Sequence, residues 1–314
     1  MLRTAVLALG GNALARSDEP ATVTNQFRHA RESVTPIVEL ARQGWRIVIV
    51  HGNGPQVGDE LVRHEAARKV VAPLPLGVLV AETAGWIGYM LQQSLQNALA
   101  GAGVERDVVT VLTQTLVDRY DPALSQPTKP IGHALTAHEA ARIRDAGRAV
   151  GKDGAGQWRR MATSPLPLGV VEFPAIKRLL ELGVVVIAAG GGGAPVYLDP
   201  LLGLEGLDAV VDKDRVSAIL ASQLDAEVLM ILTNVDAVFE GWGTPGARPI
   251  RRMSCEQAEA MIAGGSLDAG GMKPKIEAAA GFVRRGGTRA IIAKLSEGPA
   301  ALRGETGTTI TRSL

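Results

Sequence analysis

Short runs of aliphatic residues alternate with longer amphipathic stretches along this chain. Six runs are apolar enough to be strands covered on both faces: 6–9, 46–50, 108–112, 184–188, 228–232 and 290–293. Between them, apolar residues recur at helical spacing in 25–43 and 76–100, and Pro36 is expected to kink or split the first helix. Strands separated by helices predict right-handed crossovers, hence a three-layer α/β/α sandwich around a mostly parallel sheet.

Residues 119–167 interrupt this alternation. The segment carries five prolines and many charged residues. A compact α/β domain rarely contains so long an irregular insertion without a use for it. We therefore expect a small protruding lid subdomain hinged at its Pro- and Gly-containing ends. A surface excursion with no role is the alternative.

Composition narrows the possible functions. Lys and Arg number 33 against 32 Asp and Glu, so the net charge of +1 disfavours nucleic-acid binding. Hydrophobic residues make up 46% but aromatic residues only 4%, which predicts a full core built from aliphatic side chains. The chain lacks a long apolar span and a signal-peptide layout, so we expect a soluble, cytoplasmic protein with no membrane partner. The single cysteine, Cys255, excludes an internal disulfide and is expected to be buried.

Glycine-rich loops follow three of the predicted strands: Gly10-Gly11-Asn12, Gly52-Asn53-Gly54 and Gly190–Gly193. Ligands of open parallel sheets bind beyond the carboxyl ends of the strands. Glycine there lets backbone N–H groups face an anion, and the next helix adds positive potential. One such loop is explained by a tight turn, whereas a pair on separate strands favours a phosphate or carboxylate site. The four-glycine run fits either close approach of a phosphoryl group or a hinge between lobes.

Three lysines lie where Gly and Pro fix the chain: Lys129, Lys213 and Lys275. A lysine between two aspartates, as Lys213 is, often forms an ordinary surface ion pair worth ~0–1 kcal/mol. Phosphoryl transfer, however, requires fixed cations, because negative charge spreads over the phosphoryl oxygens and catalysis is mainly positioning and neutralisation. The lysines therefore point to phosphoryl transfer at the glycine loops.

Other chemical signatures are missing from the sequence. It contains no P-loop and no nucleophile elbow, and the five histidines have no metal-ligand spacing. The formal G-x-G-x-x-G at 241–246 contains Pro245 and precedes no helical pattern, so it is interpreted as a loop. His51 lies beside the second glycine loop, and a structural role is favoured for it over lining the anion site.

These motifs resemble the carbamate kinases of the amino-acid kinase superfamily nearly from end to end. The glycine loops alone indicate only the superfamily. Two blocks are specific to carbamate kinases: His-Gly-Asn-Gly-Pro-Gln-Val-Gly at 51–58 and Pro-Thr-Lys-Pro-Ile-Gly at 127–132. The sequence departs from the usual family pattern at Lys273, where a small residue is common, at Asn234, which replaces Asp, and at His133, which often is Pro.

The resemblance implies a reversible, Mg²⁺-dependent reaction of ATP with carbamate that gives ADP and carbamoyl phosphate. In the family it commonly runs backwards to make ATP during arginine or other ureido-compound breakdown. The resemblance also implies a homodimer and one amino-acid kinase domain, residues 1–314. Its acceptor lobe would span about 1–205 and its nucleotide lobe about 206–314. Mg²⁺ is expected to be carried by the ATP or ADP phosphates, so no protein ligand is named.

Site residues follow from the resemblance position by position. The carbamate and the transferred phosphoryl group would be cradled by Gly10, Gly11, Asn12, Gly52, Asn53 and Gly54. Lys129 would reach in from the lid, and Lys213 and Lys275 would neutralise the phosphoryl group and the ATP phosphates. Asp214 would hold these two lysines as an organiser. Besides them, the residues bordering the nucleotide would be Thr233, Asn234 and Met272.

Two other functions are compatible with the same fold. The first is another acyl- or phosphate-group kinase of the superfamily, and the 127–132 block argues against it. The second is a catalytically silent ligand sensor. Retention of the three lysines and of Asp214 argues against a sensor.

Overall fold

A central eight-stranded sheet organises the protein. The computed structural model describes residues 3–10, 14–15, 19–265, 267 and 271–314. In spatial order the strands are β15 (Arg252–Ser254), β17 (Thr308–Thr311), β16 (Arg289–Lys294), β12 (Val228–Thr233), β1 (Thr4–Leu9), β2 (Arg46–His51), β9 (Val185–Ile187) and β3 (Val108–Thr110). Neighbours pair in parallel except β16 with β17. The six predicted strands and the mostly parallel sheet are confirmed.

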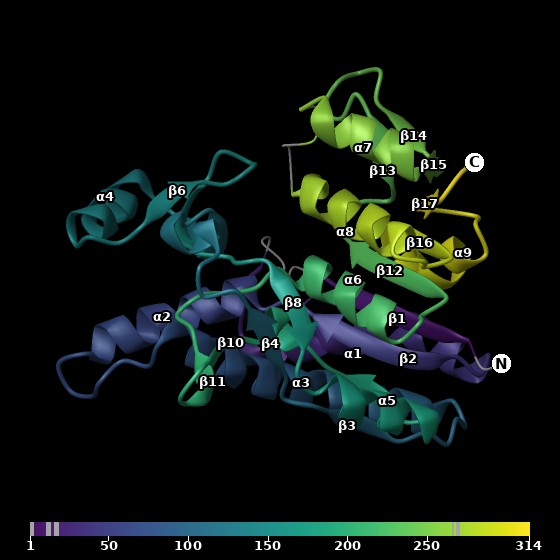
Figure 1. Cartoon of the computed structure of the whole chain (residues 1–314), viewed down its shortest axis with the longest axis horizontal. Helices are drawn as coiled ribbons and strands as arrows, with labels where there is room; N and C mark the ends of the chain where they lie inside the picture. Colours follow the sequence, from purple (N-terminus) through teal and green to yellow (C-terminus); the bar gives the residue numbers. More distant parts are fainter. Residues whose placement is uncertain (1–2, 11–13, 16–18, 266, 268–270) are drawn as a thin grey trace.

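Helices cover both faces of this sheet (Figure 1). Ala5, Leu7 and Leu9 of β1 face the layer formed by α1 (Val23–Arg42), α3 (Leu76–Gly101) and α9 (Gly298–Leu302). Val6 and Ala8 face the layer formed by α5 (Phe173–Glu181), α6 (Lys213–Gln223), α7 (Cys255–Ala263) and α8 (Met272–Arg284). Alternate residues of one strand thus enter opposite cores, as a sheet buried on both faces requires. The three-layer prediction is confirmed.

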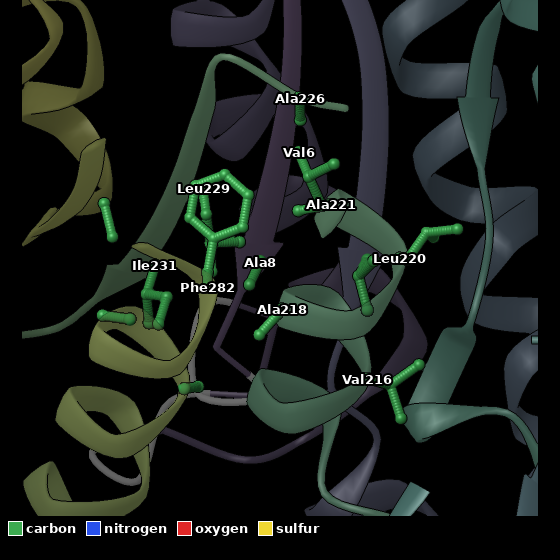
Figure 2. Close-up of a cluster of buried hydrophobic side chains, with 14 of the residues drawn as sticks. Val6, Ala8, Val216, Ala218, Leu220, Ala221, Ala226, Leu229, Ile231 and Phe282 are labelled. Carbon is green, nitrogen blue, oxygen red and sulfur yellow. The ribbon is translucent and has the colours of Figure 1, made fainter. Parts of the chain in front are cut away.

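The core between the sheet and the second helical layer is built from small aliphatic side chains. Figure 2 shows Val6 and Ala8 of β1 beside Ala218 and Leu220 of α6, with Phe282 of α8 as the one ring among the labelled residues. Small residues such as Ala218 and Ala221 let α6 approach the strands closely. This close approach brings the amino end of α6 near the ends of the central strands.

The predicted split of the first helix at Pro36 is wrong. α1 runs continuously from Val23 to Arg42, with the Thr22 hydroxyl accepting a hydrogen bond from Asn25 N at 3.2 Å. Pro36 is buried and lies against Gly298 at the start of α9. Packing of the proline ring in the core therefore outweighs the single backbone hydrogen bond that proline removes.

Residues 119–167 contain a small sheet of their own. β5 (Lys129–Leu135), β7 (Trp158–Ala162) and β6 (Val150–Lys152) pair antiparallel, and α4 (Ala137–Asp145) joins β5 to β6. In Figure 1 α4 and β6 extend to the left, away from the layered core. Thr136 and Glu139 close a capping box at the start of α4. The segment is therefore regularly folded and not a loose excursion.

Smaller elements complete the chain. A four-stranded sheet contains β11 (Gly203–Gly206), β10 (Ala194–Asp199), β4 (Gln114–Val117) and β8 (Pro167–Val170). α2 (Gly54–Ala67) follows β2, and the short hairpin of β13 (Val238–Glu240) and β14 (Arg248–Ile250) encloses residues 241–246, which form a loop as predicted.

Cys255 is buried, also as predicted. Within the described ranges, no helix is both long enough and apolar enough to cross a bilayer.

Candidate active site

A cavity of about 220 Å³ opens where β1, β2 and β12 end. Its lining comes from both halves of the chain and from the 119–167 segment. The lining residues are Gly10, Gly52, Asn53, Gly54, Pro55, Lys129, Pro130, Ile131, Gly191, Val210, Val211, Lys213, Thr233, Asn234 and Lys275. The structure thus brings together nine of the residues assigned to the site from the sequence, including all three lysines, and adds Gly191 of the four-glycine run.

Asp214 joins two of these lysines. Lys213 Nζ donates to Asp214 Oδ1 at 2.5 Å, and Lys275 Nζ donates to Asp214 Oδ2 at 2.9 Å. Asp214 and Lys213 lie at the start of α6, whereas Lys275 lies in the first turn of α8, so the shared carboxylate ties the two helices together. The lysine side chains are only 12% and 15% exposed, so each ammonium is held in one place at the cavity wall.

Burial and pairing set the charge states of this trio. Burial alone would raise the pKa of Asp214, but the two ammonium groups hold that pKa well below its usual value. Burial lowers the pKa of Lys213, and repulsion from Lys275 adds to this although Asp214 opposes it. For Lys275 burial acts in the same direction, yet the charge and hydrogen bond of Asp214 keep its pKa above the usual value. Lys213 is therefore the more easily deprotonated of the two.

The Asp212 carboxylate binds both the start of α6 and Lys129, and these contacts were not predicted from the sequence. Its Oδ1 accepts from Asp214 N at 2.9 Å and from Arg215 N at 3.2 Å, which caps α6. Its Oδ2 accepts from Lys129 Nζ, so the 119–167 segment is anchored directly to the helix that carries Lys213. An aspartate immediately before a helical pattern is an N-cap signal, and this signal was available in the sequence.

Three helices begin at this cavity. Gly54 and Pro55 open α2, Lys213 opens α6, and Lys275 lies in the first turn of α8. Each helix N-terminus carries about half a positive charge from its backbone dipoles. Together with the lysines they make the cavity strongly favourable for an anion.

The backbone N–H groups of Gly10 and Gly52 were expected to be free to bind an anion, but both are used within the sheet. Gly10 N donates to Leu232 O at 3.0 Å and Gly52 N donates to Leu9 O at 3.0 Å, so both N–H groups are used inside the sheet. The expectation that these two N–H groups face an anion is therefore wrong, because the strands remain paired to their very ends. Gly10 and Gly52 still line the cavity, where the lack of a side chain leaves room for a ligand.

Asn53 is fixed between the cavity and the body of the protein. Its side-chain Nδ2 donates to Thr83 Oγ1 of α3 at 2.9 Å, and Thr83 donates in turn to Leu79 O at 2.7 Å. Gly191 packs against the same amide, since a Cβ at Gly191 would come within 2.2 Å of Asn53 Nδ2. The amide of Asn53 is thus positioned by two neighbours at once.

The four-glycine run owes its composition to packing as well as to the cavity. A Cβ on Gly190 would lie 2.5 Å from His51 Nε2, and one on Gly193 would lie 2.3 Å from Thr115 Oγ1. Gly191, Gly192 and Gly193 also have positive φ angles, which favour glycine. His51 itself is buried, and burial lowers its pKa to about 4, so it is neutral near pH 7 and packs against the run.

Several predicted residues lie elsewhere. Met272 opens α8 but packs partly against the core instead of lining the cavity. Lys273 is half-buried beside it, outside the set of lining residues. His133 Nδ1 lies 3.0 Å from Asp59 Oδ1 of α2. Gly11 and Asn12 fall outside the described residues.

The cavity suits an anion better than a bare metal ion. The nearby carboxylates are already engaged, Asp214 by two lysines and Asp212 by Lys129 and the α6 amides. Among the described residues, no group of three or more His, Cys, Asp or Glu side chains is arranged to hold a metal.

Comparisons with known proteins agree with this geometry. A model of the Amino acid kinase family matches residues 3–294. A carbamate kinase of Pyrococcus horikoshii is 41% identical over 309 residues, which span 98% of this chain and 98% of the relative.

Solved structures give the same result. Carbamate kinase from Giardia lamblia bound to citric acid has a TM-score of 0.94 at 36% identity, covering 99% of this chain and 98% of that one. The same protein bound to AMP-PNP has a TM-score of 0.89 at 36% identity, with the same coverage. These likenesses confirm the resemblance drawn from the motifs. The chain belongs to the amino acid kinase family and, within it, to the carbamate kinases.

Proposed function

We propose that this protein transfers a phosphoryl group reversibly between ATP and carbamate, giving ADP and carbamoyl phosphate. A carbamate oxygen attacks the γ-phosphorus of ATP, and the bond from that phosphorus to the β,γ-bridging oxygen breaks as ADP leaves. The observation that carries the proposal is the convergence of Lys213 and Lys275 on Asp214 at a cavity lined by both glycine turns. Such a site neutralises and orients phosphates without forming a covalent intermediate.

The lysines are the proposed catalytic residues. Lys213 and Lys275 neutralise charge on the transferred phosphoryl group and on the ATP phosphates, and Lys129 of β5 lines the same cavity. Fixed donors aimed at developing charge are typically worth about 10²–10³ in rate each. Asp214 is a positioning residue, because both of its oxygens are bound to lysines and neither is free to accept a substrate proton.

The two ends of the cavity suggest the orientation of the substrates. Gly52, Asn53 and Gly54 lie on the β2–α2 turn and are assigned to carbamate and the transferred group. Thr233 and Asn234 follow β12 and are assigned to the nucleotide. This orientation corresponds to an acceptor lobe of about 1–205, a nucleotide lobe of about 206–314, and a lid at 119–167.

Mg²⁺ is assigned to the nucleotide in this scheme. The carboxylates of Asp212 and Asp214 are engaged by the three lysines, which fits an ion carried by the phosphates better than one held by the protein. When bound, the ion supplies further neutralisation of the phosphate oxygens. A homodimer is likewise proposed, on the family resemblance alone.

The test is formation of ATP from ADP and carbamoyl phosphate, followed by a coupled assay. The protein is expected to be active, and Lys213→Ala is expected to lower kcat by about 10²-fold or more, because it removes charge from the transition state. Lys177→Ala, a change at an exposed lysine of α5, is the matched control and should leave kcat unchanged. Failure of the folded protein to make ATP while still binding ADP would contradict the proposal and favour a ligand sensor.

A further inference from the structure

The side chain of Asn53 holds a hydrogen-bond acceptor at the catalytic cavity that the described part of the protein does not use. Asn53 occupies the N-cap position of α2, where an asparagine oxygen ordinarily accepts a hydrogen bond from the first turn. Here the side chain makes no capping bond, and the helix begins through its backbone alone, with Val57 N donating to Asn53 O at 2.8 Å. None of the described residues donates to Asn53 Oδ1, and this atom keeps accessible surface although the residue is only 5% exposed. Because Asn53 lines the cavity, its Oδ1 is open to a ligand there.

Thr83 of α3 determines which end of the Asn53 amide is free. Thr83 Oγ1 lies 2.7 Å from Leu79 O and 3.0 Å from Val80 O, and carbonyl oxygens can only accept. The one hydroxyl hydrogen is therefore used toward the backbone of α3, so the hydroxyl can only accept from Asn53, at 2.9 Å. Asn53 must turn its NH2 group toward Thr83, and Oδ1 is left for the cavity.

Gly191 keeps the plane of this amide in place. A Cβ on Gly191 would lie 2.2 Å from Nδ2, 2.5 Å from Cγ and 2.7 Å from Oδ1 of Asn53, so the glycine backbone packs against the face of the amide. Thr83 is fully buried, which holds the other partner still. The direction and the plane of the acceptor are thus both set before any ligand binds.

Positive charge on the cavity wall determines which end of a small anion meets this acceptor. Lys129, Lys213 and Lys275 line the cavity, and α2 begins there, so carboxylate oxygens are attracted to these groups. Asn53 Oδ1 repels such oxygens but pairs with an N–H group. Carbamate and acetate have the same planar shape, but acetate carries a methyl group where carbamate carries an NH2 group. Only carbamate can satisfy both the lysines and Oδ1.

We propose that Thr83 and Asn53 together select a substrate with an amino group on its carboxyl carbon, and that Asn53 Oδ1 accepts a hydrogen bond from that amino group. Thr83 is a positioning residue, because it acts through the Asn53 amide. The inference rests on the proposed phosphoryl transfer and adds to it the origin of a preference for carbamate over simple carboxylates. A methyl group in the same place leaves Oδ1 without a partner, and a site built to bind an N–H group discriminates strongly against an analogue that lacks it.

The test compares two phosphoryl donors that differ only in this group, carbamoyl phosphate and acetyl phosphate. ATP formation from ADP is followed with each, and the readout is the ratio of kcat/KM for carbamoyl phosphate to kcat/KM for acetyl phosphate. For the wild-type protein we expect a ratio of at least about 10². Thr83→Val keeps the shape but removes the hydroxyl, so it should lower the ratio about tenfold, whereas Thr83→Ser keeps the hydroxyl and should leave the ratio within about twofold.

Thr308→Val is the matched control for loss of a buried hydroxyl. Thr308 is as completely buried as Thr83, and its hydroxyl donates to Ile250 O at 2.6 Å and accepts from Val238 N at 2.8 Å. It does not line the catalytic cavity. The change should therefore lower the melting temperature and leave the ratio unchanged.

Asn53→Leu keeps the test decisive if Thr83→Val does not fold. The leucine removes the acceptor and offers an apolar surface, so kcat/KM should fall for carbamoyl phosphate more than for acetyl phosphate, and the ratio should drop at least about tenfold. A wild-type ratio near one, an equal loss with both donors in Thr83→Val, or an unchanged ratio in Asn53→Leu would overturn the inference and leave the proposed function standing. A folded wild-type protein that makes no ATP from carbamoyl phosphate would overturn both.

Discussion

At the scale of single residues, the site depends on carboxylates that position lysines. Asp214 divides its oxygens between Lys213 and Lys275, and Asp212 divides its own between Lys129 and the α6 amides. Deeply buried carboxylates are costly unless they are paired, and here each is fully paired. The pairs hold three flexible lysine side chains in place before any substrate arrives.

The trio of Lys213, Asp214 and Lys275 predicts a specific pH dependence. The pKa of Lys213 lies below its usual value, so its charge, and kcat with it, should be lost as pH rises through a value below the usual lysine range. Asp214→Asn removes an attraction that favours the ammonium, so this alkaline limb should move to still lower pH. The measurement is log kcat against pH, with exposed Asp107→Asn as control. An unmoved limb in Asp214→Asn would contradict the assignment.

The bonds of Asp212 to Lys129 and to the α6 amides predict a coupling between the 119–167 segment and α6. Asn also caps helices, so Asp212→Asn should keep α6 capped while releasing Lys129. We expect kcat to fall about tenfold, as for a lost charged hydrogen bond, with the melting temperature nearly unchanged. Combined with Lys129→Ala, the change should cost little more than Lys129→Ala alone. If the fold-losses in kcat of the two single variants instead multiply in the double variant, Asp212 does not act through Lys129.

At the scale of elements, the contact between α2 and β5 fixes the position of the strand that carries Lys129. Gly58 of α2 faces Gly132 of β5 so closely that a Cβ on Gly58 would lie 2.0 Å from Gly132 Cα. Gly132 also has a φ of +75°. The two glycines therefore let β5, which carries Lys129, lie directly on α2, whose first residues line the catalytic cavity.

This contact predicts that Gly58→Ala displaces β5. The added methyl group cannot fit against backbone, so β5 should shift and take Lys129 with it. We expect a raised KM for carbamoyl phosphate and a lower kcat, with faster amide hydrogen exchange in 129–135. Gly85→Ala in α3 is the matched control, since a Cβ there meets nothing within 4 Å and alanine favours a helix. Equal behaviour of the two variants would argue against the contact.

The sequence was most informative about elements and least informative about side-chain contacts. Continuous apolar runs such as 228–232 identified the central strands, because a strand buried on both faces needs no polar residue. Of the two effects expected of Pro36, the split was wrong, because packing of its ring in the core outweighs the one backbone hydrogen bond that it removes. The used N–H groups of Gly10 and Gly52, and the anchoring of Lys129 by Asp212, depend on strands and helices far apart in sequence. Spacing along the chain could not reveal them.

At the scale of the whole molecule, the layered fold concentrates positive potential at one edge of the sheet. α2, α6 and α8 all begin at the catalytic cavity, and each brings a residue that lines it. α2 starts there because it directly follows the parallel strand β2, whereas α6 follows β11 of the small sheet and α8 follows α7, so the fold brings these three helix starts together from separate parts of the chain. The positive potential of the cavity thus comes from two sources, the N-termini of the three helices and the ammonium groups of the lysines.

The most direct test of this account is a crystal structure with ADP, Mg²⁺ and a planar fluoride mimic of the transferred phosphoryl group. Lys213 Nζ and Lys275 Nζ should both lie within about 3 Å of the mimic or of the adjacent phosphate oxygens, with Asp214 still between them. Ammonium groups directed away from the mimic, in an otherwise closed complex, would contradict it.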